Sequence, residues 1–153
     1  MLICSHGGIY FSSTESGECV LLRVCAYNCS AVRSLDCFGQ FALIETKYRN
    51  HVNDSSATHT LEESRNSWYA LYLYYGSVLC LSVNLSNNIC KSYPALYFYP
   101  TSQYTCSISY SSIVNNTTNR GRGCILLITT GSLCCIDTCN ILNNNQASSD
   151  RAK

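Results

Sequence analysis

Apolar residues recur along this chain with two spacings, one short and one long. In ALYLY (70–74) and ALYFY (95–99) they alternate, a pattern typical of strands buried on one face. On the longer scale, CSISYSSIVNN (106–116) returns 28 residues later as CCIDTCNILNN (134–144), and VLCLSVNLSNN (78–88) precedes both at the same offset. A motif that recurs at a fixed spacing predicts stacked structural repeats.

The fixed offset predicts which side chains stack inside the repeats. The aligned columns are Val78–Cys106–Cys134, Cys80–Ile108–Ile136 and Leu85–Ile113–Ile141. One repeat cannot bury its inward face alone, so equal positions of neighbouring repeats must lie above one another. Each repeat ends in Asn or Asp, which tolerate left-handed backbone angles and form local side-chain hydrogen bonds. We therefore expect a corner ladder formed by Asn28, Asp54, Asn88, Asn116 and Asn144.

Two earlier copies of the segment are weaker and less regularly spaced. They are CVLLRVCAYN (19–28) and FALIETKYRNHVND (41–54), and the excess length falls in the polar stretch 55–68, which we interpret as an inserted loop. A further strand and a turn containing Gly or Ser precede each segment. The expected strands are 8–11, 35–38, 70–74, 95–99 and 124–128, with turns at 16–17, 39–40, 76–77, 101–102 and 131–132. Together these elements predict the rungs of a parallel β-helix, an all-β fold.

Short motifs resemble the right-handed parallel β-helix repeats of the polymorphic outer-membrane protein family. Gly7-Gly8-Ile9-Tyr10 is similar to the family's GGAI motif without its alanine. The motifs similar to FxxN are LSNN (85–88), IVNN (113–116), ILNN (141–144) and, more loosely, CAYN (25–28). The resemblance covers residues 7–146 and implies a right-handed single-stranded, pectin-lyase-like solenoid that is extracellular, adhesin-like and non-catalytic. We expect one β-helix domain over residues 1–153, of about five rungs, as a fragment of a longer surface protein.

The low charge and the short apolar runs argue against nucleic acid and membranes as binding partners. Charged residues make up 12% of the chain and the net charge is +1, so we expect no surface for nucleic acid or for an anionic membrane. The apolar runs 69–85 and 124–136 both break at a Gly-Ser pair, short of the roughly 20 residues of a membrane-spanning helix. The start, MLICSHGGIYF, lacks the basic and long apolar regions of a secretory signal.

The chain contains 12 cysteines, and their pattern predicts a structural role. Cys106 and Cys134 fall in one ladder about 4.8 Å apart, a spacing that suits a disulfide poorly, so we expect small apolar thiols that fill the interior. Disulfides remain open for the cysteines outside the ladders, which are Cys4, Cys19, Cys29, Cys37, Cys90 and Cys124. The CxxxC pairs at 25–29 and 135–139 do not converge on strands, so we expect no metal site.

The alternative function is that of a polysaccharide-active enzyme, a lyase or glycosidase of the same architecture, and it would require suitably placed carboxylates. A glycosidase needs two carboxyl groups roughly 5–10 Å apart, but the equivalents of Asp137 are Ser109 and Leu81. Glu18 and Glu45 become neighbours only if the first rungs align. We interpret a second polar group mainly as a solvated insertion and its approach. It consists of His51, Asp54, His59, Glu62, Glu63 and Arg65. We expect no cofactor and no catalysis.

Tyrosines are the main candidates for binding. If Leu71, Leu73, Leu96 and Phe98 point inward, an outward aromatic face forms from Tyr10, Tyr72, Tyr74, Tyr97 and Tyr99. Such a face can stack on a glycan or bury against a cell-surface protein. Alternatively, the rings stack on one another and only shield the sheet.

Five N-glycosylation sequons begin at Asn28, Asn53, Asn84, Asn115 and Asn116. The abundance of Ser and Thr partly explains their number, and a glycan on a buried corner ladder would disrupt it.

Overall fold

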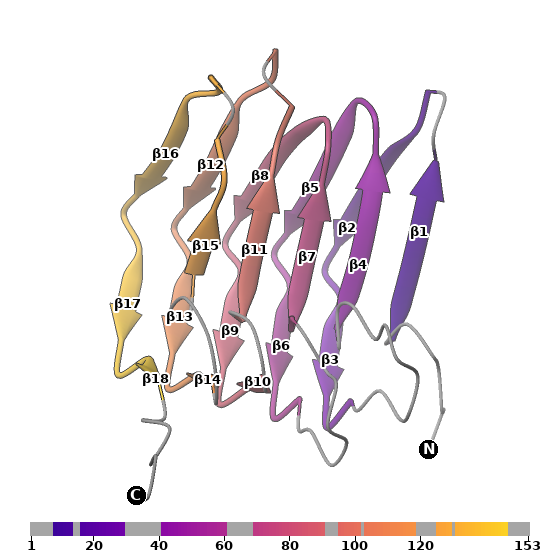
Figure 1. The fold of residues 1–153 in the computed structure, drawn as a ribbon. Coiled ribbons are helices and arrows are strands. Elements are labelled where there is room, and N and C mark those ends of the chain that lie inside the picture. The colour runs from indigo at the N-terminus through magenta and orange to yellow at the C-terminus, as the bar shows by residue number, and fades with distance from the viewer. Residues whose placement is uncertain are drawn as a thin grey trace, which may run out of the picture.

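The chain winds as a β-solenoid built from parallel strands. The computed structural model describes residues 8–13, 16–29, 41–60, 69–90, 95–101, 103–118, 125–129 and 131–146. None of these residues is helical, and they form strands β1 to β18, which pair only in parallel. Successive coils therefore pair with one another along the axis (Figure 1). This confirms the predicted β-helix, while its right-handedness stays a prediction.

Four sheets form the walls, and each coil contributes one strand to each of the three large ones. Sheet A contains β1 (Ile9–Ser13), β4 (Ala42–Thr46), β7 (Leu71–Tyr74), β11 (Leu96–Tyr99) and β15 (Ile125–Leu127). Sheet B contains β2 (Glu18–Leu22), β5 (Arg49–Asn53), β8 (Ser77–Leu81), β12 (Cys106–Ser109) and β16 (Cys134–Asp137). Sheet C contains β3 (Cys25–Tyr27), β6 (Ser56–Thr58), β9 (Asn84–Ser86), β13 (Ser112–Val114) and β17 (Asn140–Leu142). Sheet D contains β10 (Ile89–Cys90), β14 (Thr117–Thr118) and β18 (Asn145–Gln146).

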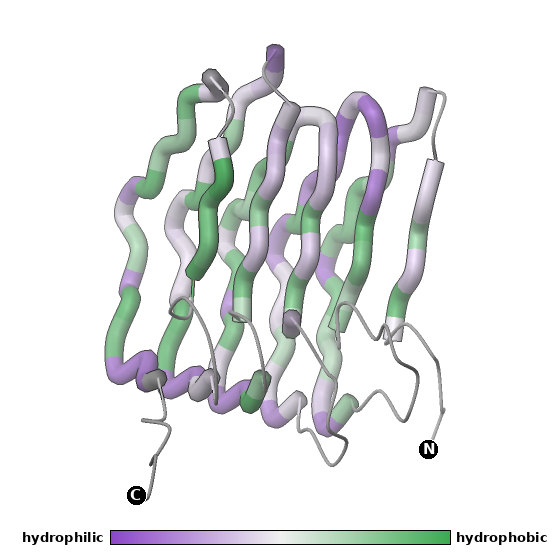
Figure 2. Tube along the Cα trace, viewed as in Figure 1, coloured by the Kyte–Doolittle hydropathy of each residue, from purple (hydrophilic) through white to green (hydrophobic). Residues whose placement is uncertain are grey.

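The core lies between the sheets and follows the predicted columns. Val78, Cys106 and Cys134 are register partners in sheet B, as are Cys80, Ile108 and Ile136. Leu85, Ile113 and Ile141 are partners in sheet C, and the side chains of Leu85 and Ile113 are fully buried. Buried and half-buried residues alternate along β7, β8, β11 and β12, and the corner after sheet C is hydrophilic (Figure 2). The 28-residue offset therefore predicted the stacking of these side chains correctly.

Two corners of each coil place one residue in the left-handed region of backbone space. Between sheets B and C these residues are Arg23, Asp54, Ser82, Tyr110 and Thr138, with φ between 48° and 56°. After sheet C they are Asn28, His59, Asn87, Asn115 and Asn143, with φ between 52° and 56°. Asparagine occupies four of the five positions in the second column because it adopts this conformation more readily than most residues.

A ladder of buried amides follows the second corner. Oδ1 of Asn116 accepts from the backbone N–H of Asn88 at 3.1 Å and from its Nδ2 at 2.9 Å. Asn116 in turn donates to Oδ1 of Asn144 through its backbone N–H at 3.0 Å and its Nδ2 at 2.9 Å. Each Nδ2 also donates to a carbonyl of the preceding coil, as from Asn116 to Leu85 at 2.9 Å. The predicted ladder of Asn88, Asn116 and Asn144 is therefore present.

Asn28 and Asp54 do not belong to this ladder, so that part of the prediction is wrong. Tyr27 is level with Thr58, which places Asn28 beside His59 in the left-handed column. Asp54 lies at the other corner, where its N–H donates to the carbonyl of Leu81. The first described ladder member is Thr60, whose Oγ1 donates to Oδ1 of Asn88 at 2.8 Å. The offset in sheets B and C is 31 residues between the first two coils, as from Leu22 to Asn53, but 28 between the next two, as from Ser56 to Asn84. Thr60 and not Asp54 is therefore equivalent to Asn88.

The segment 41–54 was predicted to be one copy of the repeat segment, but it contributes to two different sheets. Its first part is β4, which pairs with β1 in sheet A, and its second part is β5 in sheet B. The inserted loop predicted at 55–68 begins later than expected. Its first residues include β6, which pairs within sheet C, and Thr60, which belongs to the amide ladder. Residues 61–68, the strand predicted at 35–38 and the turn at 39–40 lie outside the described residues.

A buried asparagine, Asn50, fixes the turn between sheets A and B. Its Nδ2 donates to the carbonyls of Tyr74 at 3.0 Å and Tyr75 at 2.8 Å, and its Oδ1 accepts from the N–H of Thr46 at 3.1 Å. Beside it, Gly76 has φ of 50°, and a Cβ there would lie 2.7 Å from the carbonyl carbon of Tyr48. The predicted turn at 76–77 therefore requires glycine for both conformation and space.

The cysteines of the described part divide between the interior and the surface: Cys19, Cys80 and Cys90 are buried, whereas Cys25 and Cys135 are exposed. Cys106 and Cys134 are joined as a disulfide, with their Cα atoms 4.5 Å apart. Free thiols were expected at these two positions, and the structure pairs them instead. Of the predicted disulfide candidates, Cys19 and Cys29 have free thiols and Cys90 is buried, while Cys4, Cys37 and Cys124 lie outside the described residues.

Replacing Asn116 with Ala is expected to lower the free energy of unfolding by on the order of 3 kcal/mol, because the Asn88 N–H and the Leu85 carbonyl lose buried partners. Urea unfolding followed by circular dichroism measures this change. Asn84→Ala, at an exposed position on sheet C, is the matched control and should shift stability by less than about 0.5 kcal/mol. Equal losses for the two variants would contradict a role for the ladder.

Alkylation should separate buried from exposed thiols. Burial raises the pKa of the fully buried Cys80 thiol, which keeps it protonated and unreactive at pH 8. Iodoacetamide should therefore modify the exposed Cys25 and Cys135 in the folded protein and spare Cys80 until the chain is unfolded. Peptide mass spectrometry reads the sites, and rapid modification of Cys80 in the folded state would contradict its burial.

Candidate functional site

The candidate site lies on the outer surface of sheet A. In β7, Leu71 and Leu73 are fully buried, so the residues between and after them, Tyr72 and Tyr74, point outward. The same alternation in β11 turns Tyr97 and Tyr99 outward. Because the strands pair in register, Tyr72 lies beside Tyr97 and Tyr74 lies beside Tyr99. The arrangement of these four tyrosines was therefore predicted correctly.

These rings stack on one another along the solenoid axis. The ring centroids of Tyr72 and Tyr97 are 4.8 Å apart with an interplanar angle of 2°. Those of Tyr74 and Tyr99 are 4.9 Å apart at 28°. This separation matches the distance of about 4.8 Å between paired strands, so the sheet itself sets the stacking distance. The rings are half-buried, as expected if they shield the sheet.

Two further tyrosines complete what we call the tyrosine cluster, consisting of Tyr69, Tyr72, Tyr74, Tyr75, Tyr97 and Tyr99. Tyr69 is buried and lies tilted against Tyr72 at 4.9 Å and Tyr97 at 4.8 Å. The Tyr75 ring is 3.9 Å from the Tyr74 ring and is 43% exposed. Neither residue was predicted, since one precedes the strand and the other sits in the turn, where alternation gives no signal.

Tyr10 stands apart from the cluster. It occupies the same outward column as Tyr72, but Leu43 lies between the two in register. Leu43 is buried, whereas Tyr10 is 52% exposed. The predicted aromatic face is therefore a half-buried cluster on β7 and β11, with a separate exposed ring on β1.

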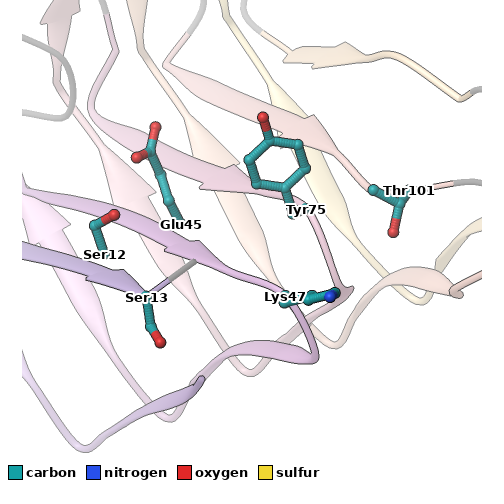
Figure 3. A pocket seen from close by; sticks show the side chains of 6 residues that line it. All are labelled: Ser12, Ser13, Glu45, Lys47, Tyr75 and Thr101. Carbon is teal, nitrogen blue, oxygen red and sulfur yellow. The ribbon is translucent and has the colours of Figure 1, made fainter. Parts of the chain in front are cut away.

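A groove of about 360 Å³ lies beside the cluster, at the end of sheet A that leads into the turns. Among the described residues its lining consists of Ser12, Ser13, Glu45, Lys47, Tyr75 and Thr101. Figure 3 shows the side chains of Glu45 and Tyr75 rising from the sheet on the same side, with Lys47 and Thr101 nearer the turns. Glu45 is level with Ser12 on one side and Tyr74 on the other. The groove thus combines a carboxylate, an ammonium group and hydroxyls next to aromatic rings.

The surroundings raise the pKa of two phenols of the cluster, Tyr72 and Tyr74, and so keep them neutral. Burial is the main cause that raises the pKa of Tyr72, and the neighbouring phenols and the Glu45 charge raise it further. A side-chain hydrogen bond with Tyr75 is the main cause that raises the pKa of Tyr74, followed by burial. Neutral phenols both donate and accept hydrogen bonds, as recognition of a hydroxylated ligand requires.

The carboxylates considered for catalysis lie in different places. Glu18 forms an ion pair with Arg49 on the neighbouring strand, at 3.3 Å, so it does not align with Glu45. Asp137 is level with Ser109, and Ser109 with Leu81, as predicted. Oδ1 of Asp137 accepts a hydrogen bond from Thr138 at 3.1 Å. None of these three carboxylates therefore lies level with another in the described strands.

The predicted polar group around 51–65 is also dispersed. His51 is in sheet B, where its Nε2 is 3.4 Å from Oγ of Ser77, and burial is the main cause that lowers its pKa. His59 is at the corner after sheet C, with its ring 5.4 Å from that of Tyr27. Glu62, Glu63 and Arg65 lie outside the described residues. Within the described part, no three His, Cys, Asp or Glu side chains come close enough to hold a metal ion.

Comparisons with protein-family models, with curated proteins and with solved structures found no match for this chain. The described ranges contain no helix of the length and apolar character that a membrane crossing needs.

The raised pKa values predict a loss of stability at alkaline pH. Above about pH 10 the unfolded chain ionises at Tyr72, whereas the folded chain holds this phenol neutral, so unfolding becomes more favourable as pH rises. Tyr72→Phe should therefore flatten the fall of the melting temperature between pH 9 and about pH 11. Tyr110→Phe, which changes a ring that is 64% exposed, is the control and should leave the wild-type slope. A slope unchanged by Tyr72→Phe would contradict the burial of its phenol.

Proposed function

We propose that this protein is a non-enzymatic, adhesin-like β-solenoid module of a cell surface that binds a glycan at the tyrosine cluster and its groove. Right-handedness and the resemblance to the polymorphic outer-membrane protein family belong to the same proposal. A protein ligand is the competing occupant. The observation that carries the proposal is the position of a groove lined by Glu45, Lys47 and hydroxyl groups directly beside the stacked rings.

Sugars require both features of this surface. The ring faces and edges of tyrosine bury the apolar C–H groups of a pyranose, and its hydroxyl serves as a hydrogen-bonding group. The groove adds Glu45, Lys47 and the hydroxyls of Ser12 and Thr101, which suit the several hydroxyl groups of a sugar. Its volume of about 360 Å³ lies at the lower end of ligand pockets, which start at about 300 Å³. Tyr75 belongs to both the cluster and the groove, and we assign it the central contact.

A polysaccharide-active enzyme is the second candidate, because Glu45 lies in the same groove as Lys47 and Tyr75. Glycosidases use two carboxyl groups, and Glu45 is the one carboxylate among the described lining residues. This composition favours binding without cleavage. A third reading, a purely structural module, has the tyrosines stabilise sheet A without a ligand.

Tyr75→Ala is expected to weaken glycan binding about tenfold, which corresponds to a loss of roughly 1.4 kcal/mol. The measurement is an array of neutral and acidic oligosaccharides followed by calorimetry on the best binder. Tyr110→Ala is the matched control, because Tyr110 is also an exposed tyrosine with a left-handed backbone and lies between sheets B and C. It should bind as the wild type does.

Three outcomes would count against the proposal. Binding that survives Tyr75→Ala would remove the cluster as the site, and an array without any binder would favour the structural reading or a protein ligand. Release of new reducing or unsaturated ends from a polysaccharide, abolished by Glu45→Gln, would show an enzyme instead.

A further inference from the structure

The structure sorts the five N-glycosylation sequons into accessible and inaccessible ones. A sequon presents an asparagine amide for glycosylation and requires a Ser or Thr two residues later. In the folded protein, the modified amide must project into solvent with room for a bulky glycan. Burial and hydrogen bonding of both residues therefore decide which sequons the fold tolerates.

Asn116 and Asn53 fail this requirement. The Nδ2 of Asn116 lies inside the buried ladder, where it donates to the Leu85 carbonyl and to Oδ1 of Asn144, both at 2.9 Å. The hydroxyl residue of its sequon, Thr118, is fully buried. For Asn53 the side-chain Oδ1 is buried, and the hydroxyl residue of its sequon, Ser55, is also buried and accepts a hydrogen bond from the Val24 N–H at 3.1 Å. A glycan at Asn116 would break the ladder contacts, and the sequon of Asn53 has its hydroxyl residue out of reach.

Asn84 and Asn115 meet the requirement. Asn84 is the first residue of β9 and is exposed, with its side chain on the outer surface of sheet C. Asn115 is exposed at the corner between β13 and β14, in the left-handed conformation. Their hydroxyl residues, Ser86 and Thr117, are half-buried and so remain partly open to solvent.

We propose that Asn84 and Asn115 are N-glycan attachment sites of this protein and that Asn53 and Asn116 stay unmodified. The donor is an oligosaccharide linked through its C1 to a lipid diphosphate. The side-chain nitrogen of asparagine forms a bond to C1 as the C1–O bond breaks. The lipid diphosphate leaves with the electron pair, and the amide nitrogen loses one proton. This site assignment stands apart from the proposed ligand of the tyrosine cluster.

The position of the two sites leaves the tyrosine cluster uncovered. Asn84 and Asn115 belong to sheet C and its corner, whereas the cluster belongs to sheet A, a different wall of the solenoid (Figure 1). Glycans at these positions would shield the exposed surface of sheet C. The solenoid would therefore carry sugar on one wall while another wall keeps its groove open.

The test expresses the full 153-residue chain behind an added secretion signal in a eukaryotic secretory host. Enzymatic deglycosylation in heavy-oxygen water, followed by peptide mass spectrometry, marks each formerly glycosylated asparagine. We expect marks at positions 84 and 115 of the secreted, folded protein and none at 53 or 116. The secreted protein should lose two glycans on deglycosylation if Asn28, whose sequon ends outside the described residues, is first replaced by Gln.

The adjacent sequons provide internal controls. Thr117→Ala removes the sequon of Asn115 but keeps that of Asn116, which depends on Thr118, so the secreted protein should lose the mark at 115 and gain none at 116. Thr118→Ala should leave the mark at 115. Absence of a glycan at 84 or 115 in the secreted wild-type protein, or a glycan at 116 in folded protein, would overturn the proposal. Circular dichroism and thermal melting show whether each secreted variant is folded.

Discussion

In-register pairing of parallel strands is the constraint on which the rest of this protein depends. Each coil has apolar side chains on its inner face, and only the coils beside it can bury them. Equal positions therefore stack about one strand spacing apart. Leu85 and Ile113 meet this requirement with apolar contact, while Asn88, Asn116 and Asn144 meet it with hydrogen bonds between buried amides. The interior therefore tolerates buried polar groups where each coil provides a hydrogen-bond partner for the next coil.

The same constraint creates the surface of sheet A. Tyrosines at equal positions of β7 and β11 have to stand beside each other, and the sheet brings their rings to 4.8 Å and 4.9 Å. Much of their ring surface is used in these contacts. The groups that remain for a ligand are the ring edges, the hydroxyls and the more exposed Tyr75 at the rim of the groove. Stabilisation of the sheet and recognition therefore use different parts of the same residues.

The sequence predicted the fold and part of the site because repetition is visible without coordinates. The 28-residue offset located the core columns, and alternation located the four outward tyrosines of β7 and β11. The ladder prediction failed at Asp54 because residue type suggested a false equivalence, whereas the 28-residue offset continues from Asn88 back to Thr60. It failed at Asn28 because the offset before that is 31 residues. Asn50, Tyr69 and Tyr75 were missed for another reason. Their roles arise from contacts with turns and with neighbouring coils, and such contacts produce no periodic pattern in the sequence.

The amide ladder gives the solenoid an intrinsic electrical direction. The Oδ1 of Asn88, Asn116 and Asn144 accepts from the preceding ladder residue, and the Nδ2 of Asn88 and Asn116 donates to the Oδ1 of the next asparagine. Thr60 starts the series by donating through its Oγ1. The aligned amide dipoles polarise one another, so a member in the middle strengthens the bonds on both sides of it. A coil added in the reverse orientation would set oxygen against oxygen or nitrogen against nitrogen. The chemistry of one buried side chain therefore favours head-to-tail polarity along the coils from Thr60 to Asn144.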